Sequence, residues 1–275
     1  MAVVLPPEIL GHIVSFPDPI VDQPVLRNLS LSNTTLRHLS QERLFLHIHL
    51  LYSKESTKTQ PGERLFSLLT RSPHLAFYIK RITIKNPDHQ WSPDPHLLPA
   101  IQQINLHQIE AVELGSGPHH VHGLFTPWAT LSRDMQRAMI ALCRSPSLTH
   151  LTVYRLPYAL VSACSPSIKD LNVRCLWSDR GSQISLRPRP RPLALRSLEL
   201  YGVETLSPTV NDIIQAMNID LSSLEHLVVR ADGTRDYAAT QKLFEQCSST
   251  LRSFHFSPGL GHLGKSRSPN AFSIH

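Results

Sequence analysis

One spacing of apolar residues recurs along most of the chain: an apolar residue is followed three positions later by a second and five positions later by a third. In each copy the last two apolar positions alternate with other residues, which is the period of a half-buried β-strand. The pattern therefore predicts eight short strands. The copies are Phe45, Ile48, Leu50; Ile79, Ile82, Ile84; Ile109, Val112, Leu114; Leu148, Leu151, Val153; Ile168, Leu171, Val173; Leu195, Leu198, Leu200; Leu224, Leu227, Val229; and Leu251, Phe254, Phe256.

The intervals between these strands carry apolar residues at helical spacing, most clearly over 63–70, 133–143, 209–217 and 237–247. We interpret those apolar faces as core packing onto the strand layer. Most intervals are close to the 20–29 residues of a leucine-rich repeat. Strands that alternate with helices at this period predict an α/β solenoid with a parallel sheet on its concave face.

Residues 1–46 lack the strand pattern and predict three short helices. In the first, Ile9, Leu10, Ile13 and Val14 share one face, and the prolines within 16–19 end the helix. Second and third helices are predicted around the leucine-rich stretch at 25–31 and over about 35–45. So few residues make a very small core, and such a unit usually needs a neighbouring domain or a partner.

This N-terminal segment resembles an F-box. The matching residues are Leu5, Pro6, Glu8, Ile9, Leu10, Ile13, Leu26, Leu29, Ser30, Leu31, Leu36, Leu44 and Phe45. With the repeats behind it, the chain resembles the leucine-rich-repeat F-box proteins of mushroom-forming fungi. The expected organisation is an F-box over 1–46, an irregular leucine-rich-repeat solenoid over 47–257 and a disordered tail over 258–275.

The resemblance implies a substrate receptor of an SCF-type ubiquitin ligase, which binds a Skp-family adaptor and through it a cullin. By their places in the motif, we assign the adaptor contact to Leu5, Pro6, Ile9, Leu10 and Leu31. The receptor itself would do no chemistry and need no cofactor. Two positions depart from the F-box pattern: Leu36 stands where Trp is frequent, and Ser32 stands where Val is common. A leucine-rich-repeat interaction scaffold with a degenerate F-box, which recruits no ligase, is the alternative.

A protein substrate would bind the concave face of the predicted sheet, where the polar positions of each strand point. Tyr154, Arg174, Tyr201 and Arg230 occupy the same place in four of the last five strands. Tyrosine and arginine are enriched at binding hot spots. We therefore predict that these four side chains bind the substrate, against the simpler interpretation of an ordinary solvated face.

Other motifs suggest chemistry that their context does not favour. Residues 259–266 match the P-loop pattern, but no downstream strand follows to supply a metal-binding aspartate, so an NTPase is the weakest hypothesis. His119, His120 and His122 have no cysteine or carboxylate close in sequence, which favours a loop over a metal site. The alternating Arg-Pro stretch at 187–192 is interpreted as a solvated loop.

Charge and cysteine content set the remaining expectations. The net charge of +6 is mild and does not require nucleic acid as a partner. The four cysteines, Cys143, Cys164, Cys175 and Cys247, include no C-x-x-C pair, and we expect buried free thiols in a reduced compartment. With no apolar run long enough to cross a bilayer and no secretion signal, we expect a cytoplasmic or nuclear protein without membrane contact.

Overall fold

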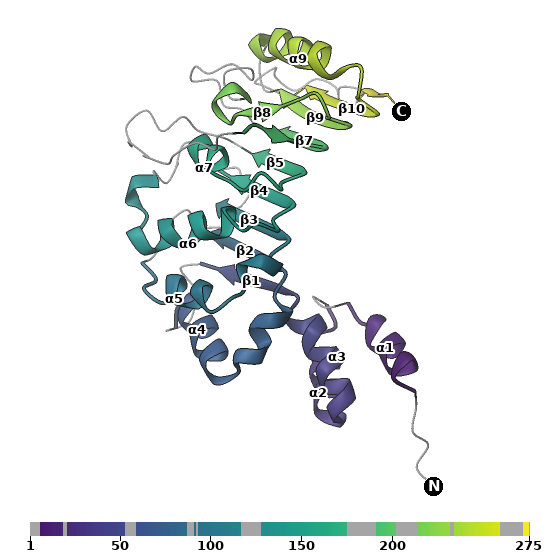
Figure 1. The fold of residues 1–275 in the computed structure, drawn as a ribbon, viewed down its shortest axis with the longest axis vertical. Helices are drawn as coiled ribbons and strands as arrows, with labels where there is room; N and C mark the ends of the chain where they lie inside the picture. The colour runs from purple at the N-terminus through teal and green to yellow at the C-terminus, as the bar shows by residue number, and fades with distance from the viewer. Residues whose placement is uncertain are drawn as a thin grey trace, which may run out of the picture.

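The structure of the chain is a computed structural model that describes residues 6–18, 21–52, 59–86, 91, 93–116, 128–174, 191–201, 214–231, 234–258 and 272–274. It is an α/β fold in which one long, mostly parallel sheet alternates with helices (Figure 1). The N-terminal helices are α1 (Pro7–Ser15), α2 (Gln23–Ser32) and α3 (Thr34–Phe45). They lie beyond one end of the sheet, next to its first strand.

Within the described residues, the main sheet has nine strands whose order in space follows their order in the chain. The strands are β1 (His47–Leu51), β2 (Arg81–Asn86), β3 (Ala111–Ser116), β4 (His150–Tyr154), β5 (Asp170–Arg174), β7 (Ser197–Tyr201), β9 (His226–Ala231), β10 (Ser253–Pro258) and β11 (Phe272–Ile274). All neighbours are parallel except β10 and β11, which are antiparallel. The short strands β6 (Leu193–Ala194) and β8 (Ile219–Asp220) pair separately.

The apolar pattern sets the strand register. Ile48 lies opposite Ile82 and Leu50 opposite Ile84, and this alignment of equivalent positions continues through every parallel pair to β10. The eight strands predicted from the sequence are confirmed. Since successive side chains point to opposite faces of a sheet, one apolar face results, and it faces the helices.

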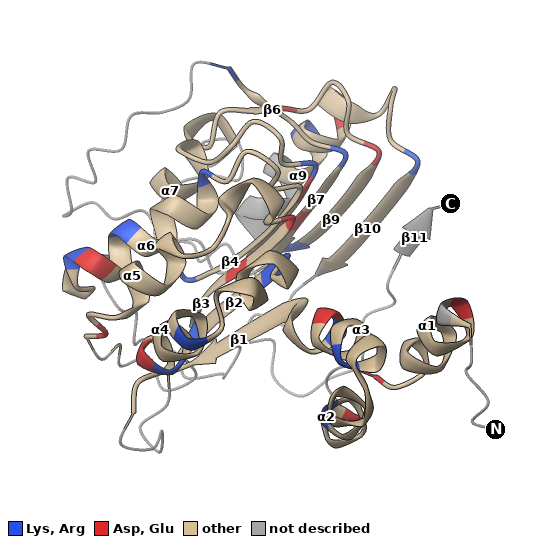
Figure 2. Ribbon diagram, turned by 60° about the horizontal axis from the view of Figure 1, so that its bottom comes forward, with Lys and Arg blue, Asp and Glu red and all other residues tan. Residues whose placement is uncertain are grey.

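Helices α4 (Pro61–Arg71), α5 (Leu97–Gln102), α6 (Arg133–Cys143) and α7 (Tyr158–Ser162) lie along one face of the sheet (Figure 1, Figure 2). A further helix, α9 (Thr234–Cys247), contacts β9 near the other end. The predictions at 63–70, 133–143 and 237–247 are confirmed, and at 209–217 the described residues include a helical turn at 214–216. Helices α5 and α7 were not predicted because they span fewer than two turns. The 3₁₀ turns are η1 (Pro73–Tyr78), η2 (Leu106–Gln108) and η3 (Trp128–Thr130).

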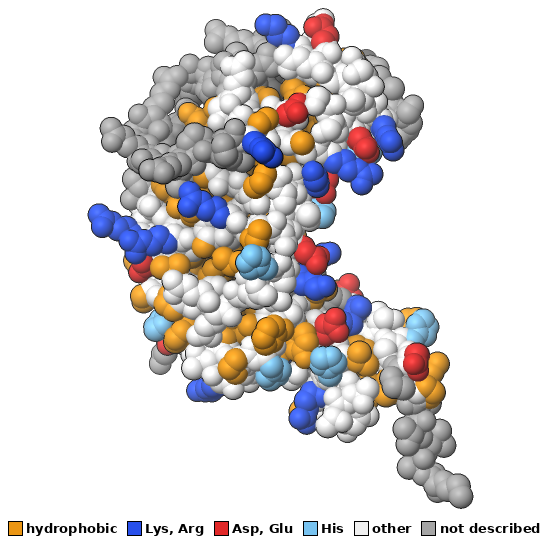
Figure 3. Space-filling model, in the orientation of Figure 1, with side chains coloured by type: hydrophobic (Ala, Val, Ile, Leu, Met, Phe, Trp, Pro, Cys, Tyr) orange, Lys and Arg blue, Asp and Glu red, His pale blue; other side chains and the backbone are white. Residues whose placement is uncertain are grey.

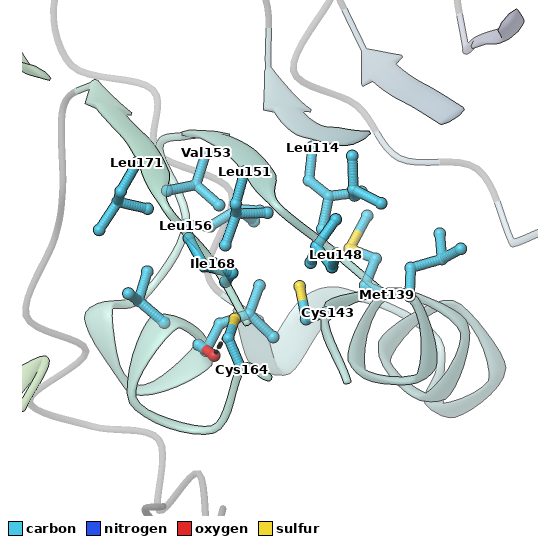
Figure 4. Packing of buried hydrophobic residues seen from close by; sticks show 14 of the residues in the cluster. Leu114, Met139, Cys143, Leu148, Leu151, Val153, Leu156, Cys164, Ile168 and Leu171 are labelled. Carbon is cyan, nitrogen blue, oxygen red and sulfur yellow. Dashed lines mark hydrogen bonds between the residues drawn. The ribbon is translucent and has the colours of Figure 1, made fainter. Parts of the chain in front are cut away.

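The core between helices and sheet is continuous from β1 to α9. In Figure 4, Met139 and Cys143, which lie on α6, approach Leu114 and Leu148, which belong to the strand layer. Cys143, Cys164 and Cys247 are buried free thiols, as predicted, while Cys175 lies outside the described residues. A hydrogen bond with Cys164 and burial raise the pKa of the Cys143 thiol, so it stays protonated and behaves as a small apolar side chain.

Hydroxyl groups connect successive turns at the starts of the strands. The buried Ser145 hydroxyl donates to the carbonyls of Leu106 and Ile109, and Ser167 Oγ donates to Leu148 O at 2.8 Å. Thr250 Oγ1 makes the equivalent bond to Leu224 O at 2.9 Å. Each hydroxyl bonds a backbone carbonyl of the preceding turn. The Ser-Pro-Ser sequences at 145–147 and 165–167 and the threonine at 250 thus tie one turn to the next.

A buried carboxylate joins β1, α4 and α5. Asp94 is 1% exposed, and its Oδ2 accepts from Tyr52 Oη at 2.9 Å and from the Gly62 amide at 2.7 Å, while Oδ1 accepts from the His96 amide. Burial and the neighbouring Asp94 raise the pKa of Tyr52, which keeps its hydroxyl a donor. Nothing in the sequence pattern predicted this network, because Asp94 stands alone in a proline-rich segment.

Replacement of Asp94 by Ala should therefore lower the free energy of unfolding by about 2–3 kcal/mol, since three donors lose a charged acceptor. Urea unfolding followed by circular dichroism measures this change. Asp134→Ala is the matched control: that carboxylate is exposed on α6, and its loss should cost no more than about 0.5 kcal/mol. An Asp94→Ala protein as stable as the control variant would show that the network adds nothing.

The three N-terminal helices have a small core of their own. Val14, Leu26 and Leu36 are buried together, and the partly buried leucines 10, 29, 39 and 44 pack around them. The predicted helices and the end of the first at Ser15 are confirmed. At the other end of the chain the structure differs from the expected disordered tail, because Phe272–Ile274 pairs with β10. None of the described helices is long and apolar enough to cross a membrane.

Candidate functional site

The face of the sheet opposite α4–α7 carries three rows of side chains that run across the strands. The parallel register aligns each row, because residues at the same place in successive strands are direct neighbours about 4.8 Å apart. In Figure 3 the molecule is hollowed on the side of this face, and charged and histidine side chains line the hollow. Regularly placed polar groups that line a depression are a candidate binding site.

The four predicted substrate-binding residues form one continuous row. Tyr154 of β4 pairs in register with Arg174 of β5, then with Tyr201 of β7, then with Arg230 of β9. The Arg174 guanidinium carbon lies 5.0 Å from the centre of the Tyr154 ring and 4.7 Å from that of Tyr201. Both distances are within the range of a cation–π interaction. The row is therefore an arginine held between two tyrosines, with Arg230 as the next member.

Polar side chains of the adjacent row fix this arrangement. Arg174 Nε donates to Asn172 Oδ1 at 3.1 Å, and the Asn172 amide donates to Glu199. Burial raises the pKa of both Tyr154 and Tyr201, which are also hydrogen-bonded to Glu113 and Glu199. The tyrosines are therefore neutral donors at physiological pH.

The same surface continues toward the N-terminal helices with a second polar group. Lys85 Nζ forms a 2.7 Å ion pair with Glu113 and lies 5.6 Å from the centre of the Tyr154 ring. Thr83 Oγ1 donates to Glu113 at 3.2 Å and lies 2.8 Å from His47 Nε2. Lys85 continues the row of Tyr154, and Thr83 and Glu113 continue the adjacent row of Asn172 toward β1.

A hollow of about 300 Å³ opens over β1–β5, and side chains from both the group around Arg174 and the group around Glu113 line it. Arg174, Tyr154, Asn172, Glu113, Arg81 and His47 are among its lining residues. Gly115 lies opposite Lys85 and Tyr154 in the register, and it has no side chain to fill the row between them. This gap lets Lys85 approach the Tyr154 ring.

Sequence reasoning missed part of this surface. The polar positions of each strand were expected on this face, and the contacts above place Thr83, Lys85, Glu113, Asn172 and Glu199 there. His47 and His49 of β1, Arg81 and His150 were not expected there. The alternation of His47, Ile48, His49 and Leu50 was the available signal, because it repeats the pattern of the later strands.

The two histidines of β1 lie with their ring centres 3.8 Å apart and their ring planes tilted by 36°. Burial, His49 and Arg81 lower the pKa of His47 from 6.5 to about 4. A folded-state pKa below the unfolded value means that the unfolded chain binds the proton more readily. Stability supplied by neutral His47 should therefore be present above pH 6.5 and be lost as the pH falls toward 4.

An NMR titration of the imidazole carbons, with His47→Gln to assign the resonance, tests this directly. The His47 resonance should titrate at about 4, well below the ordinary value of 6.5. A His47 pKa at or above 6.5 would contradict the described packing.

The structure separates the five predicted adaptor-binding residues into different environments. Ile9 is 47% exposed and Leu31 is 77% exposed, and Pro6 is also exposed. Leu10 instead packs against the small core of the helices. Leu5 lies outside the described residues.

Further apolar side chains of this unit face outward without having been assigned to the contact. They are Ile13, Phe16, Val21 and Val25, with exposed fractions of 39%, 74%, 77% and 47%. The prediction that Ile9, Leu10, Ile13 and Val14 share one face therefore needs a correction. Helix α1 turns Leu10 and Val14 inward and leaves Ile9 and Ile13 at the surface.

The remaining motifs fall on other parts of the chain. The histidines at 119, 120 and 122, the P-loop-like sequence at 259–266 and most of the Arg-Pro stretch lie outside the described residues. Within the described residues, no three His, Cys, Asp or Glu side chains converge as a metal site would require. No protein-family model and no curated protein matches this sequence.

Proposed function

We propose that this chain is the substrate-recognition adaptor of an SCF-type ubiquitin ligase. In this proposal α1–α3 form an F-box that binds a Skp-family adaptor and, through it, a cullin. The strands and helices behind them form an irregular leucine-rich-repeat solenoid whose exposed sheet face binds a protein substrate. Other subunits of the ligase carry out the ubiquitin transfer.

The observation that carries the proposal is the surface of the N-terminal helices. Among the described residues of Ile9–Leu31, six large apolar side chains are exposed, in a unit of fewer than fifty residues. Exposed apolar groups gathered on one small unit mark a surface that a partner covers. Two of them, Ile9 and Leu31, are among the residues that the F-box resemblance assigns to the adaptor contact.

The position of this unit also supports the proposal. Helix α3 runs directly into β1, and Tyr78 of η1 hydrogen-bonds His38 of α3 at 2.7 Å. The Arg43 guanidinium reaches back to Pro17 O at 3.1 Å. An adaptor bound to the helices would therefore hold the sheet in a fixed direction, which a ligase needs in order to position a substrate.

Co-expression of the full chain with a Skp-family adaptor and the N-terminal half of a cullin tests the proposal. Size-exclusion chromatography should yield one complex containing all three proteins. If the chain elutes without the adaptor, the ligase proposal is wrong and the alternative of an interaction scaffold remains.

A further inference from the structure

The carboxylates on the exposed face of the sheet are already occupied by neighbouring side chains. Glu113 pairs with Lys85 at 2.7 Å, Glu199 accepts from Asn172, and Asp170 Oδ2 lies 2.8 Å from His150 Nε2. These acids therefore do not compete strongly for a further cation.

Two arginines in the row of Tyr154 are not occupied in this way. Within the described residues, neither Arg174 nor Arg230 forms an ion pair, and only Nε of Arg174 donates a hydrogen bond. The terminal N–H groups of a guanidinium form a fork that matches a carboxylate or a phosphate. Two cationic forks thus remain available to a ligand on this face.

Arg174 is also held in place before any ligand binds. The rings of Tyr154 and Tyr201 lie on either side of its guanidinium, and Asn172 fixes the Nε end. A side chain whose rotamer is already fixed loses less entropy when it binds, so it contributes more to affinity. Arg230 is more exposed, but it lies close enough to Tyr201 for its charge to act against the rise that burial causes in the pKa of that tyrosine.

The spacing of the two arginines limits the form of the ligand. Arg174 and Arg230 are two strands apart in the register, which corresponds to about 10 Å. A peptide in the polyproline II conformation rises about 3.1 Å per residue with three residues per turn. Residues three apart therefore lie on one side of such a peptide, about 9 Å from each other. Tyr201 would contact the residues between them.

We propose that this row binds an extended peptide that carries two anionic groups three residues apart, one on Arg174 and one on Arg230. The anions are side-chain carboxylates or phosphoryl groups, which share the chemistry that a guanidinium recognises. The inference rests on the proposed function in one respect: it takes this face as the substrate receptor.

Fluorescence anisotropy of the full chain with labelled peptides tests the proposal without any ligase subunit. The probe is Ser-Pro-Glu-Pro-Ala-Glu-Pro-Ser, and a phosphoserine version replaces both glutamates. One control peptide has Gln for Glu, and another, Ser-Pro-Glu-Glu-Pro-Ala-Pro-Ser, keeps the composition but makes the acids adjacent. We expect the Gln peptide to bind at least about tenfold more weakly and the adjacent-acid peptide about fivefold more weakly than the probe. The phosphoserine version distinguishes phosphorylated from acidic substrates.

The protein variants locate the binding. Arg174→Gln and Arg230→Gln should each weaken binding of the probe peptide about tenfold. The affinity of Arg174→Lys for the probe should fall between those of the Gln variants and that of the original chain. A lysine ammonium keeps the charge but has neither the planar fork nor the stacking of a guanidinium. Arg137→Gln is the control: this arginine is exposed on α6, away from the row, and the variant should bind the probe as the original chain does.

Equal binding of the Glu and Gln peptides would overturn the proposal. So would binding that survives both Arg→Gln changes in correctly folded protein, or no binding of any acidic peptide. Because the adaptor is absent from this assay, none of these outcomes bears on whether the N-terminal helices recruit a ligase.

Discussion

Replacement of Gly115 by Ala should be among the most destabilising single changes in the chain. Gly115 has a φ of +125°, a conformation that other residues rarely adopt. A Cβ atom there would lie 1.9 Å from the carbonyl oxygen of Tyr154 on the neighbouring strand. The backbone of β3 or β4 would have to move, and we expect the free energy of unfolding to fall by about 3–4 kcal/mol. For a chain of this size, thermal unfolding should shift down by about 6–12 °C.

Gly11→Ala is the matched control for this change. Gly11 lies inside α1, and a Cβ built there meets nothing within 4 Å. Alanine stabilises a helix interior by about 0.5–1 kcal/mol relative to glycine, so this variant should be slightly more stable than the original chain. If Gly115→Ala were as stable as Gly11→Ala, the described backbone of β3 at Gly115 would be wrong.

The double change Ile9→Asp and Leu31→Asp should abolish adaptor binding without unfolding the chain. Both side chains are exposed, so the folded chain tolerates a carboxylate at either place. In a complex with the adaptor, the same carboxylates would be buried in an apolar interface without partners. We expect the dissociation constant for a Skp-family adaptor, measured by isothermal titration calorimetry, to rise by at least about 100-fold.

Phe77→Asp is the control for this pair. Phe77 of η1 is 68% exposed, so the change also removes an exposed apolar side chain, but outside α1 and α2. It should leave adaptor affinity unchanged. An adaptor that binds the double variant as tightly as it binds the original chain would show that Ile9 and Leu31 are not in the interface.

The strands were predictable because the burial of one face of the sheet sets both the apolar pattern of each strand and the register between strands. Each strand must bury two alternate residues under the helices. The local apolar pattern is therefore enough to place Leu151 opposite Leu171. The short helices α5 and α7 were not predictable in this way. Their few residues are held by the surrounding core, and tertiary packing overrides weak local propensity.

The sequence predicted which residues of the candidate site lie in one row, but it did not predict how their side chains interact. The common position of Tyr154, Arg174, Tyr201 and Arg230 followed from the repeat. Their interaction depends on side-chain conformations that no spacing rule gives. Leu10 illustrates the same limit in the helices, because a leucine in a small core and a leucine at an interface look alike in sequence.

Hydrogen–deuterium exchange of the full chain, with and without a Skp-family adaptor, tests the central proposal most directly. The account predicts that the adaptor slows amide exchange in α1 and α2, where the exposed apolar residues lie, and leaves β4–β9 unchanged. That result would place the adaptor on the N-terminal helices and leave the sheet face available to a substrate. Unchanged exchange in α1 and α2, or protection centred on the strands, would contradict it.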